Sequence, residues 1–273
     1  FFIQLQLIRM KIVRQQKLKG FALSQIGEHF NNFFHNHLPF ELTNAQKRVL
    51  KEIRNDCAKE SQMNRLLQGD VGSGKTLVAL MSILMAIDNG FQSCLMAPTE
   101  ILAQQHFETI SNLLSEMPIK ISLLTGSVKK SQRNLIHEGL ENGETHILIG
   151  THALLEDKVK FKNLGFVVID EQHRFGVAQR AKMWLKNIKP PHVLVMTATP
   201  IPRTLAMTLY GDLDVSIIDE LPPGRKAIKT IWKSESGRLA MLGFVQKEIE
   251  KGRQAYIVYP LINESETLDY KDL

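Results

Sequence analysis

Strand-length apolar runs alternate with helical patterns through the middle of the chain, and this alternation limits the possible folds most strongly. Six runs follow one another: RLLQ, SCLMAP, ISLLTG, HILIGT, FVVIDE and HVLVMTAT. Between two of them, Ala103, Phe107 and Ile110 recur at helical spacing. Strands that are apolar along their whole length are covered on both faces, as in a parallel sheet with flanking helices. The pattern therefore predicts an α/β domain with a mostly parallel sheet.

The composition is that of an ordinary globular protein. Of the 273 residues, 44% are hydrophobic and 23% are charged, which argues against collagen-like, disordered and membrane classes. The net charge of +6 suits a polyanionic partner but does not require one. Cys57 and Cys94 lie far apart without a C-x-x-C pattern, which argues against a disulfide framework and a zinc site. Together with the lack of a membrane span or signal peptide in the first ten residues, this favours the cytoplasm.

The chain divides into three expected segments. Phe1, Leu5 and Ile8 recur at helical spacing, which predicts an amphipathic helix within a linker at residues 1–37. A polar and aromatic break over residues 31–40 precedes the main domain, which we expect at residues 38–225. The segment LPPGR ends that domain, and the strand-like run AYIVYPLI at residues 255–262 predicts the start of a second, truncated domain at residues 226–273. A first residue of Phe instead of Met suggests a fragment.

A glycine-rich segment fits the phosphate-loop pattern G-x-x-x-x-G-K-[ST]. Its residues are Gly69, Asp70, Val71, Gly72, Ser73, Gly74, Lys75 and Thr76. The segment follows a strand-like run and opens an apolar helical pattern, which is the context that this motif needs. Glycines let backbone N–H groups surround phosphates, Lys75 reaches the β- and γ-phosphates, and Thr76 can ligate Mg²⁺. The motif therefore predicts binding of a nucleoside triphosphate, ATP with Mg²⁺.

Two carboxylates follow a second buried strand. Asp170 and Glu171 come directly after the run at residues 166–169, at the carboxyl end of the strand, where open α/β sheets bind ligands. We expect Asp170 to hold magnesium, directly or through water, and Glu171 to orient and deprotonate the attacking water. The alternative is a solvated acidic strand end without a catalytic role.

The segment at residues 170–176, DEQHRFG, resembles motif II of superfamily 2 DNA helicases of the RecG family. Further segments resemble helicase motifs in the family's order: residues 98–106 motif Ia, residues 125–126 and 150–152 motif Ib, and residues 197–204 motif III. The resemblance covers roughly residues 38–262. It implies a RecA-like P-loop domain, the start of a second RecA-like domain, and a parent enzyme that couples ATP hydrolysis to movement on branched duplex DNA in recombination and repair.

The resemblance also implies roles at the nucleotide. Thr43 and Gln46 resemble the adenine-recognising Q motif, since a glutamine amide can pair with the N6/N7 edge of adenine. A helix N-cap at Thr43 with Gln46 at the third helical position would equally explain this pair. Phe40 stacks on the base or lies in the core. Four residues would couple the γ-phosphate to DNA contacts: Gln172, His173, Thr197 and Thr199. The alternative for His173 is a purely structural role.

Residues at or just beyond the ends of other predicted strands are the candidates for DNA contacts. They are Thr99, Thr125, Gly126, Thr151 and His152. Their amides and hydroxyls can hold phosphates without sequence preference, although each Thr can also be an ordinary strand-end cap. Arg203 binds DNA or braces the domain interface, and Lys129, Lys130 and Arg133 form a DNA face or, as we favour, a solvated surface.

The family's arginine-bearing QxxGRxGR segment does not occur in this sequence. Such arginines are worth about 10³–10⁵ in rate where tested, so we expect this chain to bind nucleotide weakly and hydrolyse it slowly or not at all. The missing partners would be an N-terminal wedge domain and the rest of the second motor domain. Two alternatives stay open: another translocase such as the transcription-repair coupling factor, and a regulatory ATPase without DNA activity.

Overall fold

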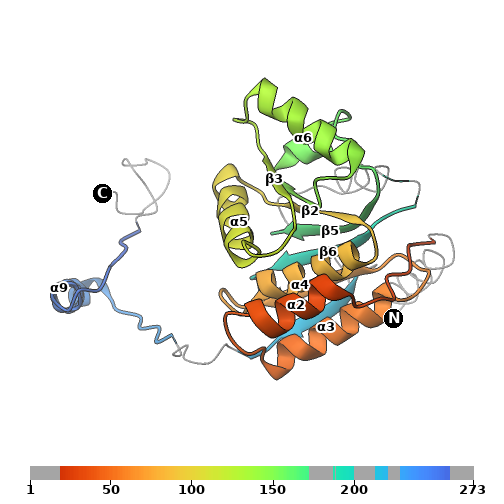
Figure 1. Cartoon of the computed structure of the whole chain (residues 1–273). Helices are drawn as coiled ribbons and strands as arrows, with labels where there is room; N and C mark the ends of the chain where they lie inside the picture. Colours follow the sequence, from red (N-terminus) through yellow and green to blue (C-terminus); the bar gives the residue numbers. More distant parts are fainter. Residues whose placement is uncertain (1–18, 172–186, 188, 200–212, 221–227, 259–273) are drawn as a thin grey trace, which may run out of the picture. The chain divides into compact units, whose positions relative to one another are not determined.

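A computed structural model of the chain describes residues 19–171, 187, 189–199, 213–220 and 228–258 (Figure 1). The chain divides into two compact units, with the boundary between residues 225 and 226. The amphipathic helix predicted at the amino terminus lies outside the described residues. No helix in the described ranges is long and apolar enough to cross a bilayer.

The first unit is built on a seven-stranded sheet in the order β3-β4-β2-β5-β6-β1-β7, and every neighbouring pair is parallel. The strands are β1 (Asn64–Gly69), β2 (Gln92–Met96), β3 (Ile121–Leu124), β4 (Ile147–Gly150), β5 (Leu164–Asp170), β6 (His192–Thr197) and β7 (Asp214–Ile218). The predicted parallel α/β fold is therefore confirmed. The sequence pattern missed β7, whose residues DVSII alternate between polar and apolar because it is an edge strand of the sheet.

The strands are apolar because both faces of the sheet are covered. Along β5, Phe166 and Val168 join one core cluster, whereas Val167 and Ile169 join a second cluster on the opposite face. This alternation follows from the two-residue period of a strand. Each face therefore buries its own set of side chains, and the whole of β5 before Asp170 is buried.

Four longer helices cover the sheet: α3 (Asn44–Cys57), α4 (Lys75–Asp88), α5 (Glu100–Leu113) and α6 (Lys130–Asn142). Helices α3, α4 and α5 contribute to the first core cluster, and α6 contributes Leu140 to the second. Helix α4 is buried from Leu77 to Ile87, as expected for a helix that is apolar around its circumference. Cys57 and Cys94 are both buried, and neither forms a disulfide.

The break predicted over residues 31–40 was wrong in its first part. Helix α2 (Glu28–Asn32) continues directly into the π-helix η1 (Phe33–His37), and the chain leaves helical geometry only at Leu38. The helical path persists because Phe33 is fully buried in the core and because Asp88 of α4 accepts backbone N–H groups from Gly27, His29 and Phe30. Tertiary contacts thus overrode the polar composition.

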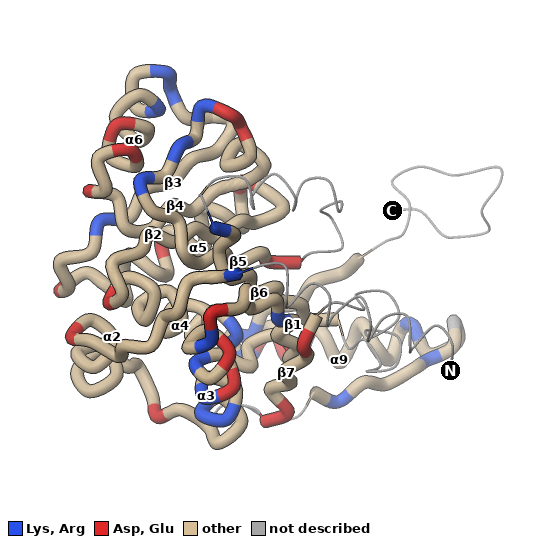
Figure 2. The backbone as a smooth tube through the Cα atoms, turned by 90° about the vertical axis from the view of Figure 1, so that its right-hand side faces the viewer, with Lys and Arg blue, Asp and Glu red and all other residues tan. Residues whose placement is uncertain are grey.

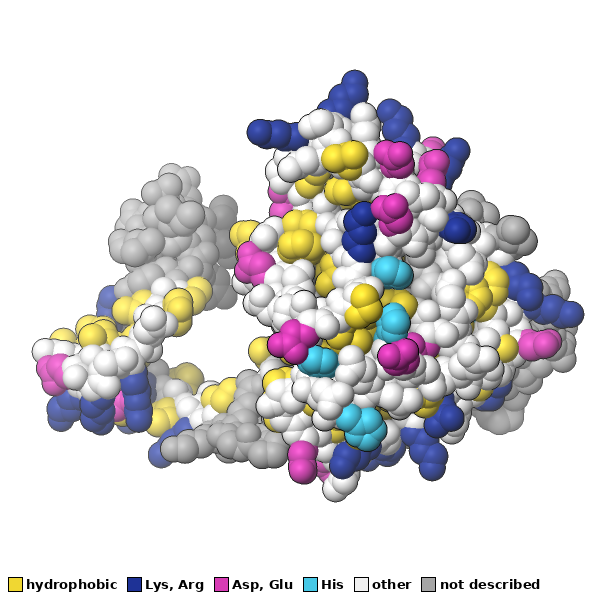
Figure 3. Space-filling view, in the orientation of Figure 1, with side chains coloured by type: hydrophobic (Ala, Val, Ile, Leu, Met, Phe, Trp, Pro, Cys, Tyr) yellow, Lys and Arg dark blue, Asp and Glu magenta, His cyan; other side chains and the backbone are white. Residues whose placement is uncertain are grey.

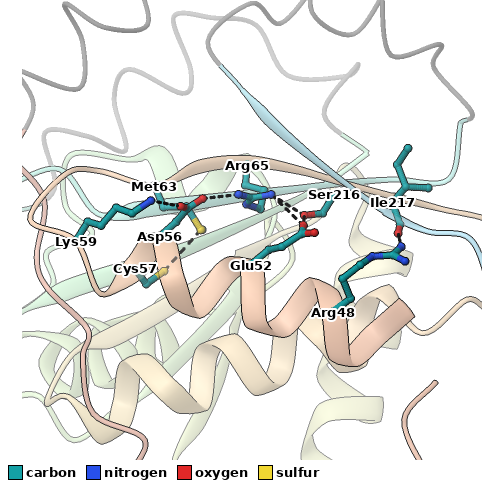
Figure 4. Close-up of polar contacts among 9 residues, drawn as sticks. All are labelled: Arg48, Glu52, Asp56, Cys57, Lys59, Met63, Arg65, Ser216 and Ile217. Atoms are coloured by element: carbon teal, nitrogen blue, oxygen red, sulfur yellow. Dashed lines mark hydrogen bonds and ion pairs between the residues drawn. The ribbon is translucent and has the colours of Figure 1, made fainter. Parts of the chain in front are cut away.

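Helix α3 is fixed to the sheet by a partly buried charged network (Figure 4). Arg65 of β1 pairs with Glu52 at 3.3 Å and with Asp56, and donates to the Ser216 hydroxyl of β7 at 2.7 Å. Burial alone would raise the pKa of Asp56, but hydrogen bonds from Arg65 and Lys59 outweigh that effect and lower it. Lys, Arg, Asp and Glu residues occur along the length of α3 (Figure 2). Arg65 therefore links α3 to the strands β1 and β7.

The second unit contains the short η4 (Glu235–Gly237) and the helix α9 (Arg238–Glu250), which has no buried residue. The strand predicted at residues 255–262 is not formed over residues 255–258, and residues 259–262 lie outside the described ranges. A strand needs a neighbour for its backbone N–H and C=O groups, and Tyr256 and Val258 are 87% and 89% exposed. The apolar pattern alone did not determine the local structure.

Candidate functional site

The predicted nucleotide-binding residues gather at one edge of the sheet. Strands β5, β6 and β1 are neighbours, and at their carboxyl ends stand Asp170, Thr197 and Gly69. Neighbouring strands lie about 4.8 Å apart, so the end of β5 is about 10 Å from the end of β1. This is the edge at which open α/β sheets bind ligands.

The phosphate loop between β1 and α4 depends on its glycines. Gly72 and Gly74 have φ of 75° and 87°, in the left-handed region that favours glycine. Gly74 is also the N-cap of α4, and a Cβ atom there would collide with Nε2 of Gln46. The loop therefore presents its backbone at the amino end of a long helix, a geometry suited to anions.

Two side chains in this loop fit a bound phosphate. The Nζ of Lys75 donates to the carbonyl oxygens of Gly69 at 2.7 Å and Asp70 at 3.0 Å, so its ammonium group lies over the loop. The hydroxyl of Ser73 is buried and has no hydrogen-bond partner. Because buried polar groups are almost always satisfied, an orphaned hydroxyl inside an anion-binding loop indicates a missing acceptor or water. A phosphate oxygen would supply such an acceptor.

Thr43 and Gln46 form the capping box that the sequence predicted. The Thr43 hydroxyl accepts the N–H of Gln46, and the Gln46 Oε1 accepts the N–H of Thr43 at 2.9 Å. Gln46 is fully buried, and its Nε2 donates to the carbonyl of Ser73 at 2.8 Å. Both ends of this amide are therefore occupied, one by the helix cap and one by the phosphate loop. Phe40 is 42% exposed rather than part of the core.

The two motif II carboxylates have different partners. Oδ2 of Asp170 lies 2.8 Å from Nε2 of His106 on α5. Glu171 has a φ of 49°, the one non-glycine residue with positive φ in the described part of the chain, and its Oε1 accepts the N–H of Ala198 at 3.0 Å. The Thr197 hydroxyl donates to the other oxygen of Glu171 at 3.4 Å and accepts the N–H of Thr199. The ends of β5 and β6 are thus tied together through Glu171.

The donor chemistry suits magnesium. Asp170 and Thr76 offer a carboxylate and a hydroxyl, and Mg²⁺ prefers oxygen ligands while keeping several waters or phosphate oxygens. No group of three or more His, Cys, Asp or Glu side chains in the described ranges could hold a metal ion without other ligands.

The candidate DNA-contacting residues lie on the other half of the same edge, after β2, β3 and β4. Thr99 is the N-cap of α5, and its hydroxyl accepts the N–H of Leu102 at 3.3 Å. The Thr125 hydroxyl pairs with that of Ser127 at 2.9 Å, and Gly126 is exposed beside Glu100. Thr151 is buried with an unpartnered hydroxyl, and His152 is exposed. Strand order brings these loops together because β3, β4 and β2 are neighbours.

We expected Arg133 to lie on a solvated surface, but its side chain is bound to a neighbouring loop. It donates to the carbonyl oxygens of Thr125, Gly126 and Val128 and pairs with Glu156 at 3.3 Å. It therefore holds the loop after β3 in place. Lys129 and Lys130 are exposed, and basic side chains gather over the α6 end of the molecule (Figure 3).

Three predicted site residues lie outside the described ranges: Gln172, His173 and Arg203. Sequence reasoning also missed two contributors, His106 and Glu100, and did not foresee the loop contacts of Arg133. The only signal for the first two was their position in the segment PTEILAQQH, where they share one helix with Thr99. Nothing in the sequence linked Arg133 to a turn eight residues earlier.

A parallel sheet with a phosphate loop after β1 and paired carboxylates after β5 defines the chain as a P-loop nucleotide-binding protein. Residues 43–208 match the DEAD/DEAH box helicase family, and the chain belongs to that family. This agrees with the helicase motifs found in the sequence.

Curated relatives confirm the resemblance to the RecG family. The chain is 54% identical to the ATP-dependent DNA helicase RecG of Aquifex aeolicus over 236 residues, which are 86% of this chain and 30% of that protein. It is 49% identical to RecG of Bacillus subtilis over 269 residues, 98% of this chain and 39% of that protein. The chain therefore spans well under half the length of these relatives.

Solved structures agree with the fold. A structure of RecG bound to a three-way DNA junction has a TM-score of 0.81 at 45% identity, over 95% of this chain and 35% of that one. The helicase MrfA bound to DNA and AMPPNP has a TM-score of 0.59 at 19% identity, over 86% of this chain and 36% of that one, and shares the fold.

Proposed function

We propose that this chain is the ATP-binding part of a DNA translocase that acts on branched DNA in recombination and repair. The observation that carries this proposal is the phosphate loop after β1, with its orphaned Ser73 hydroxyl, at the same sheet edge as Asp170 and Glu171. The residues around these groups match a helicase family over more than half of the chain.

At the nucleotide, Lys75 moves from the loop carbonyls to the β- and γ-phosphates, while the amides of residues 69–76 surround them. Thr76 and Asp170 would hold the Mg²⁺ that accompanies ATP, and the cation would supply positive charge against the phosphates. Glu171 orients the attacking water and accepts its proton. Thr43, Gln46 and Phe40 serve the adenine base.

Thr197 and Thr199 couple release of the γ-phosphate to the DNA contacts. Thr197 donates to Glu171, and Thr199 donates to Thr197. In the proposal, Gln172 and His173 share this coupling role. Neutral polar groups can exchange partners at small cost when the phosphate leaves.

The DNA strand lies across the loops after β2, β3 and β4, with phosphate contacts from Thr99, Thr125, Gly126, Thr151 and His152, and Arg203 added from motif III. Residues 1–37 link this motor domain, residues 38–225, to preceding segments, and residues 226–273 begin the second motor domain. A polypeptide as long as the RecG relatives would supply the N-terminal wedge domain and the rest of the second motor domain. We place this activity in the cytoplasm.

Titration of the chain with ATP and Mg²⁺ tests the nucleotide site. Loss of the Lys75 ammonium removes charged hydrogen bonds to phosphate, so Lys75→Ala should weaken binding by about 10–100-fold. Lys51→Ala, an exposed lysine of α3, is the matched control and should bind like the unmodified chain. Equal affinity of the Lys75 and Lys51 variants would contradict the assignment.

Binding of a forked DNA duplex tests the second half of the proposal. A translocase of this kind should bind the fork with a salt-dependent affinity, because phosphate contacts release counterions. The same assay on the complete polypeptide decides between the two classes, because binding of MgATP without salt-dependent affinity for any duplex or fork would indicate a regulatory ATPase.

A further inference from the structure

His106 connects helix α5 to the carboxylate that we assign to magnesium. Its Nε2 lies 2.8 Å from Oδ2 of Asp170, and the two side chains are only 13% and 14% exposed. An ionised carboxylate can only accept hydrogen bonds. Nε2 of His106 is therefore the N–H donor, and Oδ2 of Asp170 accepts the hydrogen bond. That hydrogen bond engages Oδ2 of Asp170, so Oδ1 is the oxygen that can ligate a cation or its water.

The beginning of the same helix is tied to the candidate DNA loops. Thr99 caps α5, and Oε1 of Glu100 accepts the N–H of Ser127 at 3.2 Å in the loop after β3. Glu100 and His106 are six residues apart on one helix, which corresponds to about 9 Å along its axis. Helix α5 therefore has one hydrogen bond to the proposed DNA side and another to the proposed nucleotide side.

We propose that His106 is a positioning residue that orients Asp170 toward nucleotide-bound magnesium and makes that orientation depend on the position of α5. This inference rests on the proposed function of Asp170. Hydrogen bonds to a ligating carboxylate fix its orientation, and their loss typically costs about 10–100-fold in metal affinity. Because α5 is a rigid element with contacts at both sites, DNA bound at its first turn changes how well Asp170 holds the cation.

A purely structural role for His106 would change stability without changing the Mg²⁺ dependence of nucleotide binding. Substitutions at the imidazole separate these roles by geometry. The amide of His106→Gln places a donor near the position of Nε2, whereas the shorter amide of His106→Asn ends near the position of Nδ1 and cannot reach Asp170. Gln105→Leu, an exposed change on the same helix, is the control.

The experiment measures ATP binding by the protein as a function of Mg²⁺ concentration, alongside thermal unfolding without ligand. We expect His106→Asn to raise the Mg²⁺ concentration for half-maximal binding by about 10–100-fold, and His106→Gln to restore most of the affinity. ATP binding measured in EDTA should be equal in all four proteins, because it does not involve Asp170. An unchanged Mg²⁺ midpoint in His106→Asn, whatever its stability, would overturn the inference.

The DNA connection is tested by repeating the Mg²⁺ titration with a forked duplex. DNA should shift the Mg²⁺ midpoint of the unmodified protein and of Gln105→Leu, and the shift should be absent in His106→Asn. The same shift in all three proteins would show that α5 does not act through His106. Failure of the unmodified protein to bind ATP at any Mg²⁺ concentration would instead refute the proposed function.

Discussion

The side-chain amide of Gln46 donates to the backbone carbonyl of Ser73 at 2.8 Å, so the first turn of α3 is hydrogen-bonded directly to the phosphate loop. The same side chain accepts the N–H of Thr43 and completes the helix cap. A residue predicted from the sequence as an adenine ligand or a cap is therefore also a support for the loop. Any role in adenine recognition must be compatible with these two hydrogen bonds or replace one of them.

Gln46→Glu tests the support separately from the cap. The carboxylate still accepts the N–H of Thr43, but it cannot donate to Ser73 and faces a carbonyl oxygen in a buried site. We expect a loss of about 1–3 kcal/mol in the free energy of unfolding and weaker ATP binding. Urea unfolding and ATP titration measure the two effects. Gln105→Glu on the surface of α5 should change neither, and unchanged stability of Gln46→Glu would refute the support role.

Gly90→Ala is the matched control for Gly74→Ala. Both glycines have a left-handed φ, 87° and 80°, so alanine costs about 1–2 kcal/mol of backbone strain at either position. Only at Gly74 does the new Cβ also collide with Gln46, because nothing lies within 4 Å of a Cβ at Gly90. The free energy of unfolding should fall more for Gly74→Ala, with loss of ATP binding. Equal losses of unfolding free energy in the two variants, measured in urea, would show that the phosphate loop shifts enough to relieve the collision.

The sequence predicted the parts of this molecule that depend on local pattern. Six apolar runs became six strands, and Thr43 became an N-cap with Gln46 at the third helical position. The strand β7 was missed because its residues are half exposed at the sheet edge. The bond between His106 and Asp170 was missed because it joins residues 64 positions apart, and only the packing of α5 beside β5 brings them together.

The buried His192 gives the protein a specific dependence on pH. Its Nδ1 accepts the N–H of Met63 and its Nε2 donates to the carbonyl of Phe21, so the neutral imidazole is fully hydrogen-bonded. Burial lowers the pKa of His192 to about 4, although the Phe21 carbonyl and Asp56 oppose this shift. Between pH 6.5 and about 4 the unfolded chain binds the extra proton, so stability falls as the pH falls through this range.

The shift corresponds to about 3 kcal/mol of stability that is present above pH 6.5 and lost toward pH 4. His192→Asn removes the titrating group but keeps an acceptor near Nδ1 for Met63. Urea unfolding at several pH values should therefore show a smaller pH slope in this variant, although it is less stable at pH 7. Identical slopes in both proteins would mean that His192 does not cause the acid sensitivity.

Helix α3 takes part in a partly buried ion-pair network with Arg65 of β1 (Figure 4) and in an exposed ion pair through its own Arg48, so the two can be compared directly. The Arg65 side chain is 10% exposed and pairs with Glu52 and Asp56, whereas Arg48 and its partner Asp219 are 49% and 60% exposed. Water therefore screens the Arg48 pair much more strongly than the Arg65 network.

Removal of Arg65 leaves two carboxylates near each other in a partly buried site, which costs about 3–5 kcal/mol when an ion pair is fully buried. Because Glu52 is 38% exposed, we expect the lower end of that range for Arg65→Ala. Arg48→Ala should change the free energy of unfolding much less, because solvent screens an exposed pair. Urea unfolding of both variants at pH 7 measures the difference. Similar losses would show that water reaches the Arg65 network and that α3 is held to the sheet mainly by its apolar face.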